Sequence, residues 1–313
     1  MQDDVGEHAP LVIETDPMVD TFMSAMVDNT VIARLLSMSC QEAQEQSLPN
    51  QDFAQVICRG RSSLSFCVCD GVGSSYKGDY AARYLALCLV RWLQGLTDLQ
   101  QEPAQLAAML QSYLNQCAPE AQAELEQLAF PPGTPQLVRE VLEELCNTYG
   151  SETVFLCGRI DYGSGWSTNL SISHPMQALF CWMGNVTARL FIAPDQFMKL
   201  GGEDEGGSRW STVHGCRGPI TMWSLALTTI DRLLIHTDGL DALGESLVVF
   251  SDEEWRAQAR RLRLLPKSDD MTALDLRWVH GRGDSGEWFS SFCGNVAPDW
   301  ACPLSICATP SLP

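Results

Sequence analysis

Two stretches decide the fold of this chain, Phe66-Cys-Val-Cys-Asp-Gly-Val-Gly73 and Leu234-Ile-His-Thr-Asp-Gly-Leu240. In each, a short apolar run of the kind that forms a buried strand ends in Asp-Gly. A single Asp-Gly pair is an ordinary turn signal. A carboxylate at the end of a buried strand is unfavourable, however, unless it is paired or binds a metal ion. Two such strands in one chain favour a shared carboxylate site over two unrelated turns.

Further aspartates precede two other apolar runs. Asp52 precedes Phe53-Ala-Gln-Val-Ile57, and Asp269 and Asp270 precede Met271-Thr-Ala-Leu274. Too few basic residues lie near them in the sequence to pair with all of these carboxylates. Carboxylates that converge on one edge of a sheet form a site of hard oxygen ligands, which suits Mg²⁺ or Mn²⁺.

The order of the elements around these stretches indicates the fold class. Two short β-rich runs, 53–58 and 63–69, predict a hairpin. Apolar residues at helical spacing follow, interrupted at 131–133, and predict a pair of long helices in the middle third of the chain. We expect helices over 78–93, 103–116, 135–147 and 252–264, and later strands over 151–157, 170–173, 177–182, 188–192, 220–225, 231–236 and 271–278. This order predicts an α+β fold, a β-sandwich of two mainly antiparallel sheets flanked by helices.

Composition restricts the partners. The 313 residues include 20 basic and 39 acidic side chains, for a formal charge of -19. This charge repels nucleic acid and anionic membranes, so we expect neither as a partner. No apolar run reaches the roughly 18 residues of a membrane span. An acidic surface also suits a protein that gathers divalent cations, but a merely soluble surface gives the same number.

The 13 cysteines do not predict disulfides. The first residues, Met1–Glu7, lack the basic start and apolar run of a signal peptide, which favours the reducing cytoplasm. Most cysteines lie inside apolar runs and are expected in the core. Cys67 and Cys69 would share one face of a strand, but no second pair with ligand spacing accompanies them, so we expect no zinc site.

Six elements of the sequence occur in the order found in a known family. They are Asn50-Gln-Asp52, Phe66-Cys-Val-Cys-Asp-Gly-Val-Gly73, Tyr149-Gly-Ser-Glu-Thr-Val154, Met183-Gly-Asn-Val-Thr-Ala-Arg189, Leu234-Ile-His-Thr-Asp-Gly-Leu240 and Asp269-Asp-Met-Thr272. On these motifs the chain resembles the type 2C metal-dependent serine/threonine protein phosphatases, in their bacterial form. Each motif is weak alone, but six in family order are a specific signal.

The resemblance implies a site with two divalent cations, Mn²⁺ or Mg²⁺, at the edge of the sheets. Asp70 would bridge both ions, and the Gly71 carbonyl would bind one of them. Asp238 and Asp269 would bind the other ion, and Asp52 would contribute directly or through water. Asp70 and Asp238 are the expected catalytic residues. Two ions of this kind activate a water molecule, so no serine, cysteine or histidine nucleophile is required.

The sequence departs from the family pattern at several positions. Val72 stands where many eukaryotic members have a histidine, Asn185 where the family has an aspartate, and Gln51 where an acid is frequent. The stretch Glu45–Pro49 has no arginine to bind the substrate phosphate. The segment 193–219 is expected to be a substrate flap or a plain loop. His236 is expected to be a core or interface histidine, with support of the metal site as the alternative.

These features predict a phosphatase that hydrolyses phosphoserine and phosphothreonine in phosphoproteins, the products of a serine/threonine kinase. The alternative is an inactive or weak phosphatase-like domain that binds phosphoproteins as a regulator. A second alternative is a phosphatase for sigma-factor-control proteins. We expect a flexible arm over 1–18, the catalytic domain over 19–280 and a tail over 281–313.

Overall fold

The computed structural model describes the chain from residue 10 to residue 278 with short gaps. The described residues are 10–27, 31–59, 63–128, 130, 133–162, 176–193, 196–202, 207–227, 230–248 and 250–278. Within them no helix is long and apolar enough to cross a membrane. The expected strand at 170–173 and the expected tail from 281 lie outside the described residues.

One of two sheets, sheet A, has eight strands in the described part of the chain. They are β1 (Leu11–Glu14), β4 (Phe53–Arg59), β5 (Ser63–Gly71), β6 (Glu152–Asp161), β7 (Met176–Met183), β10 (Arg209–Ser211), β11 (Gly215–Arg217) and β12 (Thr221–Leu227). β4 and β5 form the predicted hairpin, and β6 pairs with β5 along its length. The first residues of β6 pair with β10 and the later ones with β7.

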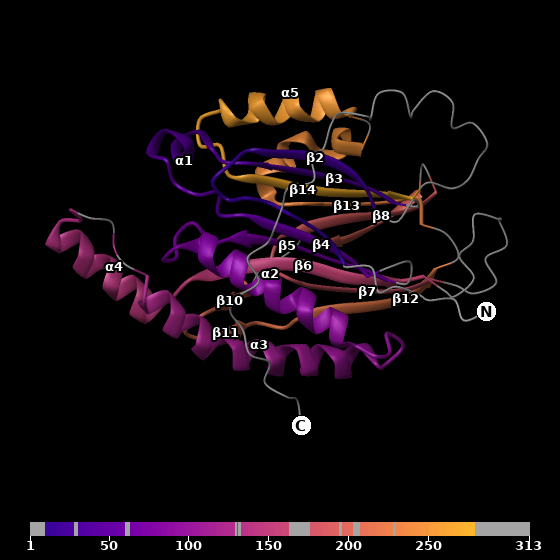
Figure 1. The fold of residues 1–313 in the computed structure, drawn as a ribbon, viewed down its shortest axis with the longest axis horizontal. Helices are drawn as coiled ribbons and strands as arrows, with labels where there is room; N and C mark the ends of the chain where they lie inside the picture. The colour runs from indigo at the N-terminus through magenta and orange to yellow at the C-terminus, as the bar shows by residue number, and fades with distance from the viewer. Residues whose placement is uncertain are drawn as a thin grey trace, which may run out of the picture. The chain divides into compact units, whose positions relative to one another are not determined.

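Sheet B packs against sheet A and has six strands in the order β2-β3-β14-β13-β8-β9. Their bounds are β2 (Thr21–Val27), β3 (Val31–Met38), β8 (Thr187–Ala193), β9 (Gln196–Gly201), β13 (Arg232–His236) and β14 (Met271–Trp278). The pairings along this order are all antiparallel. Figure 1 shows the two sheets stacked face to face. The predicted α+β sandwich is confirmed.

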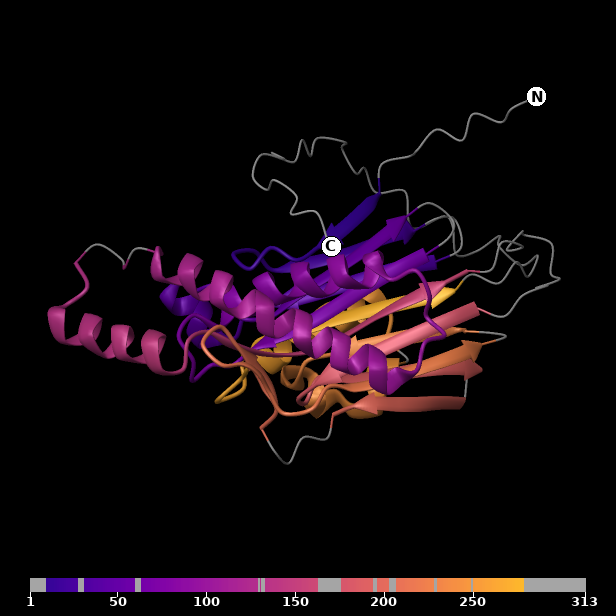
Figure 2. The same cartoon turned by 90° about the horizontal axis from the view of Figure 1, so that it is seen from below.

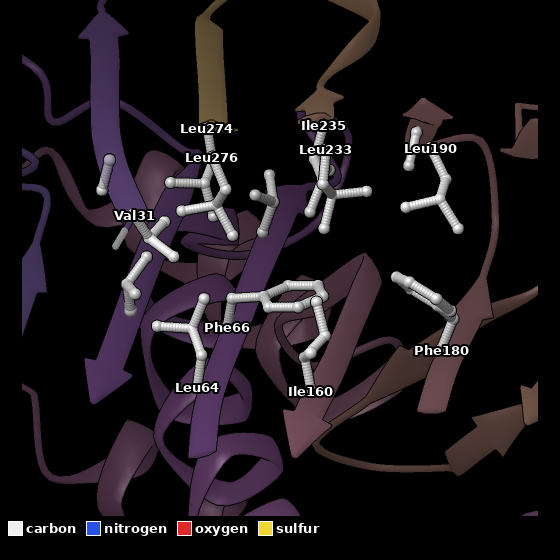
Figure 3. Packing of buried hydrophobic residues seen from close by; sticks show 14 of the residues in the cluster. Val31, Leu64, Phe66, Ile160, Phe180, Leu190, Leu233, Ile235, Leu274 and Leu276 are labelled. Atoms are coloured by element: carbon white, nitrogen blue, oxygen red, sulfur yellow. The ribbon is translucent and has the colours of Figure 1, made fainter. Parts of the chain in front are cut away.

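The main core lies between the two sheets. Because side chains alternate along a strand, every second residue of β5 and β6 points toward sheet B. Figure 3 shows side chains of both sheets meeting in this layer, and the labelled ones are Val31, Leu64, Phe66, Ile160, Phe180, Leu190, Leu233, Ile235, Leu274 and Leu276. The other face of sheet A, which includes Cys67, Cys69 and Cys157, packs against helices. The cysteines in this layer are therefore core residues, as predicted.

Helices cover both outer faces of the sandwich (Figures 1 and 2). α2 (Gly78–Gly95) lies on β5 and β6, and α3 (Pro103–Glu126) lies on β11 and β12. On sheet B, α5 (Asp252–Arg263) begins with a capping box between Ser251 and Glu254 and buries Trp255. The remaining helices are α1 (Gln41–Gln46), α4 (Gln136–Thr148) and the 3₁₀ helix η1 (Asp238–Val248).

Several expectations need correction. The flexible arm over 1–18 is wrong in part, because Leu11–Glu14 form β1, which pairs with β4 and buries Ile13. The middle third holds three helices, α2, α3 and α4, rather than a pair. α3 also continues past the expected end at residue 116, with Pro119 inside it. β2 and β3 were not expected. β2 is an edge strand of mostly half-buried residues, so its sequence lacks the apolar–polar contrast that marks a strand.

Candidate active site

Asp70 lies at the end of β5, on the face of sheet A that is turned toward sheet B. Phe66 and Val68, four and two residues before it, belong to the core between the sheets, and the alternation along the strand places Asp70 on the same face. Burial raises the pKa of Asp70 well above its ordinary value, and the charges of neighbouring carboxylates, first that of Asp238, raise it further. The second strand of the hairpin, β5, therefore places a carboxylate near its end, on the face toward sheet B.

Gly71 follows Asp70 and allows a close approach between three segments. Its N–H donates to the carbonyl of Gln51 at 3.2 Å. A Cβ at this position would lie 2.6 Å from the Gln51 oxygen and 2.6 Å from the backbone of Gly78 at the start of α2. Glycine is therefore required here by space, which is independent of the metal role that the resemblance implies for its carbonyl.

Asp238 approaches from sheet B. It follows β13 and begins η1, and the Asn185 side chain donates from Nδ2 to its Oδ2 at 2.9 Å. Asn185 lies in the turn between β7 and β8. Burial raises the pKa of Asp238, as do the charges of Asp269 and Asp241. The asparagine that replaces an aspartate of the family pattern thus positions one of the two predicted catalytic carboxylates.

Asp52 is buried, with 2% of its surface exposed, and contacts Thr237, which directly follows β13. Thr237 donates from Oγ1 to Asp52 Oδ2 at 2.7 Å, and the Asp52 N–H donates to Asn50 Oδ1 at 2.8 Å. Burial raises the pKa of Asp52 well above its ordinary value, with Asp70 next in effect. The charge of Asp70 thus acts on Asp52, and the charge of Asp238 acts on Asp70, so the structure brings these three carboxylates close together.

Asp269 and Asp270 have different surroundings although they are adjacent. Asp269 is exposed, and Asp270 is buried. The Asp270 carboxylate accepts from the N–H of Cys40 at 2.6 Å and from the N–H of Gln51 at 2.7 Å. Asp270 is thus held by two backbone donors and fixes the loop before Asp52, while Asp269 keeps its carboxylate accessible. The sequence alone did not separate these two roles.

The described residues provide these carboxylates with no cationic partner. No lysine or arginine forms a salt bridge with Asp52, Asp70 or Asp238 in the part of the chain that the structure describes. Their raised pKa values follow from burial and from mutual repulsion. Clustered carboxylates without counter-ions fit divalent cations, whose preferred ligands are oxygens. As the side chains stand, no group of three or more His, Cys, Asp or Glu among the described residues converges tightly enough to hold an ion.

His236 lies beside the site but does not point into it. Its neighbours along β13, Leu233 and Ile235, face the core between the sheets, and alternation turns His236 to the outer face of sheet B. Burial lowers its pKa, and its Nδ1 lies 3.5 Å from Asp241 Oδ1. The predicted core histidine is consistent with this placement. Asp241 was missed by the sequence reasoning, although its position one turn after Asp238 is a usable signal.

The match to a family model extends over most of the chain. The model described as protein phosphatase 2C matches residues 41–273. That interval contains all of the predicted site residues, from Asp52 to Asp269. No curated protein matches significantly in sequence.

Solved structures support the fold at low sequence identity. A mutant of a bacterial serine phosphatase is 15% identical, covers 79% of this chain and 97% of its own, and has a TM-score of 0.51. Serine/threonine phosphatase Stp1 from Staphylococcus aureus is 15% identical, with coverage of 80% and 95% and a TM-score of 0.50. RsbX in complex with magnesium is 13% identical, with coverage of 83% and 100% and a TM-score of 0.50.

These similarities agree with the motif order, the stacked sheets and the carboxylates at their edge. The family consists of serine/threonine phosphatases. The matched residues run from α1 into β14 and include both Asp-Gly pairs. The chain belongs to the protein phosphatase 2C family.

Proposed function

We propose that this protein hydrolyses phosphoserine and phosphothreonine in phosphoproteins, with two divalent cations, Mn²⁺ or Mg²⁺, bound at the carboxylate cluster. The observation that carries the proposal is the meeting of Asp52, Asp70 and Asp238 without a cationic partner among the described residues. Cytoplasmic location and a serine/threonine kinase that supplies the substrate stay predictions. The magnesium complex reported for RsbX, which shares the fold, agrees with this choice of ion.

Five groups would hold the cations: the carboxylates of Asp52, Asp70, Asp238 and Asp269 and the carbonyl of Gly71. When bound, the ions supply positive charge for the phosphoryl oxygens and an activated water as nucleophile. The protein's own residues keep the ligands in place. Asn185 orients Asp238, and Thr237 orients Asp52. Val72 has no proton to donate, so the side chain that follows Asp70-Gly71 takes no part in protonating the leaving group.

An inactive phosphoprotein-binding domain is the second candidate, and one specific observation favours it. Glu45–Pro49, where the family pattern leads us to expect a phosphate-binding arginine, contains none and includes the end of α1. Against it stands the retention of several buried carboxylates together. An unpaired buried carboxylate destabilises a fold, so a domain without metal chemistry gains nothing from this cluster.

Metal-dependent hydrolysis tests the proposal directly. The stripped protein should not cleave an aryl phosphate or a phosphothreonine peptide, and added Mn²⁺ or Mg²⁺ should restore turnover. Asp98→Asn, on an exposed loop between α2 and α3, is a charge-matched control that should behave as wild type. Full turnover in excess EDTA contradicts the two-cation site. Absence of turnover with any divalent ion, in a folded protein that still binds the phosphopeptide, supports the inactive alternative.

A further inference from the structure

Glu152, the first residue of β6, is buried between two arginines. Its side chain is 5% exposed, and each carboxylate oxygen accepts from a different guanidinium. Arg209 Nη1 lies 3.1 Å from Glu152 Oε2, and Arg217 Nη1 lies 3.0 Å from Glu152 Oε1. The arginines are neighbours across the short β10–β11 hairpin, where they are paired in register. One carboxylate thus fixes two cationic side chains of the same hairpin.

This group lies on the face of sheet A that carries Asp70. Asp70 is opposite Val154 in the β5–β6 pairing, and Glu152, two residues before Val154, has the same orientation by alternation. A diagonal pair of this kind is separated by about 7–8 Å. The Val72 N–H donates to the Glu152 carbonyl at 2.9 Å, so the chain leaving Asp70 also contacts this strand. The two arginines that contact Glu152 lie on the neighbouring strands β10 and β11, and alternation places them on the same face of sheet A as Asp70.

The turn that carries Asn185 closes the other side of the same region. Gly184 packs so tightly that a Cβ would lie 2.3 Å from the Val154 side chain and 3.1 Å from the Ser208 carbonyl. Ser208 directly precedes Arg209, and Asn185 is hydrogen-bonded to Asp238. Val154 therefore lies near three groups: Asp70, the turn that orients Asp238, and the residue before Arg209.

Both guanidinium groups have N–H donors that form no hydrogen bond within the described residues. Arg209 uses Nη1 for Glu152 and Nε for the Gly207 carbonyl at 3.0 Å, and Arg217 uses Nη1 for Glu152. Within the described residues, the other N–H groups of both have no acceptor. Their side chains are 29% and 45% exposed. One arginine would neutralise Glu152, so the pair leaves a surplus positive charge beside a cluster of carboxylates with which it forms no salt bridge.

We propose that Arg209 and Arg217, oriented by Glu152, bind the phosphoryl oxygens of the substrate and replace the arginine that the sequence lacks before Asn50. The proposal rests on the proposed function, because it places the phosphate at the carboxylate cluster. Guanidinium groups suit this role, since their planar donors match two phosphate oxygens at once. Glu152 is a positioning residue, and the two arginines contact the substrate.

Single substitutions test the pair while leaving Glu152 one cationic partner. Arg217→Gln and Arg209→Gln should each raise KM for a phosphothreonine peptide about tenfold or more, since each variant loses charge-assisted hydrogen bonds to the phosphate. We expect kcat to change less than about threefold, because the guanidinium binds phosphate in the ground state and the transition state alike. Arg217→Lys, which keeps the charge but not the planar donors, should fall between wild type and Arg217→Gln.

Arg139→Gln is the matched control, because Arg139 on α4 contacts the Phe130 ring and has the same charge but lies on another element. It should leave KM unchanged. Thermal unfolding of each variant, followed by circular dichroism, verifies that the fold persists. If neither Arg209→Gln nor Arg217→Gln raises KM above the Arg139→Gln value, or if both lower kcat with KM unchanged, the arginine pair does not bind the substrate phosphate.

Binding of inorganic phosphate, measured by calorimetry on the full chain with and without Mn²⁺, separates this inference from the proposed function. If wild type shows no turnover but binds phosphate, and both glutamine variants weaken binding about tenfold, the proposed hydrolysis fails and the phosphate site stands. If wild type turns over with Mn²⁺ and the variants match it in KM and in phosphate affinity, the hydrolysis stands and this inference is wrong.

Discussion

Two clusters of aspartates lie near the two halves of strand β14, and they differ in whether arginines neutralise them. At its beginning, Asp270 and the neighbouring Asp52 and Asp70 gather without a salt bridge from any described residue. Five residues further on, Asp275 is fully buried on the outer face of sheet B, beneath α5, and contacts three arginines. The same strand therefore holds one carboxylate cluster without counter-ions and one with more cations than anions.

The arginines around Asp275 come from three strands. Arg34 Nε donates at 2.8 Å, Arg232 Nε at 2.5 Å and Arg277 Nε at 3.0 Å. Burial alone would raise the pKa of Asp275, but the charges of Arg232, Arg277 and Arg34 outweigh it and lower that pKa. Trp255 stacks on the Arg34 guanidinium at 4.5 Å and closes the cluster.

Whether a buried acid has a cationic partner separates structural from functional acids in this fold. A buried carboxylate that the protein itself neutralises contributes to folding. One that it leaves without a cation is unfavourable in the free protein and becomes favourable when a cation binds. Substitutions in the two clusters, and the pH dependence of stability, test this distinction.

Removing a charge from the uncompensated cluster should abolish turnover without harming the fold. Asp70→Asn and Asp238→Asn should each lower kcat at least about ten-thousandfold, equivalent to about 5.4 kcal/mol of barrier. The free protein should be no less stable than wild type, because repulsion between carboxylates falls. Steady-state kinetics with Mn²⁺ and urea unfolding in EDTA measure the two effects. A variant that keeps more than a tenth of the wild-type rate shows that its carboxylate is not an essential ligand.

Removing the charge from the compensated cluster should have the opposite result. Asp275→Asn removes the buried anion that Arg34, Arg232 and Arg277 share. The loss of one member of a buried ion pair destabilises by about 3–5 kcal/mol. Urea unfolding should show this loss, while the folded fraction keeps the wild-type kcat at low temperature. If the fold is too weak to purify, Arg277→Gln, which removes the most exposed arginine of the three, should give a smaller loss of the same kind. Unchanged stability in both variants would falsify the structural role of Asp275.

The two clusters should also give pH dependences of opposite sign in the metal-free protein. The folded-state pKa of Asp70 is raised, so the folded protein binds more protons than the unfolded chain, and stability falls as pH rises from about 4 through that raised pKa. The folded-state pKa of Asp275 is lowered, so its contribution is present above the ordinary value of 3.8 and disappears as pH falls through the lowered one.

Urea unfolding in EDTA between pH 4 and pH 8 measures this effect. Wild type should lose stability toward higher pH, and Asp70→Asn should lose less, because it lacks one of the raised carboxyl groups. The difference between the two proteins isolates Asp70 from the other titrating groups. Parallel stability curves for wild type and Asp70→Asn would contradict the raised pKa of Asp70.

Much of the fold was accessible from the sequence because the determining signals are local. Apolar runs that end in Asp-Gly placed Asp70 and Asp238 at strand ends, and the spacing of two runs around residue 60 gave the β4–β5 hairpin. The predicted helices at 78–93 and 252–264 correspond to α2 and α5. Among the strands that were missed, β1 and β2 are short or lie at an edge of a sheet, where few side chains are buried on one face. β3 was missed although it is a buried inner strand of sheet B, and β9, β10 and β11 lie in 193–219, where a flap or loop was expected.

The residue types near the strand ends, and with them the family and the expected ligands, can be predicted from the sequence. Which of the acids have cationic partners becomes visible only in the folded protein. Arg34 and Asp275 are 241 positions apart, and Glu152 is 57 positions from Arg209 and 65 from Arg217. Such pairs depend on strand order and register, which are set by the packing of both sheets around the common core and leave no periodic signal along the chain.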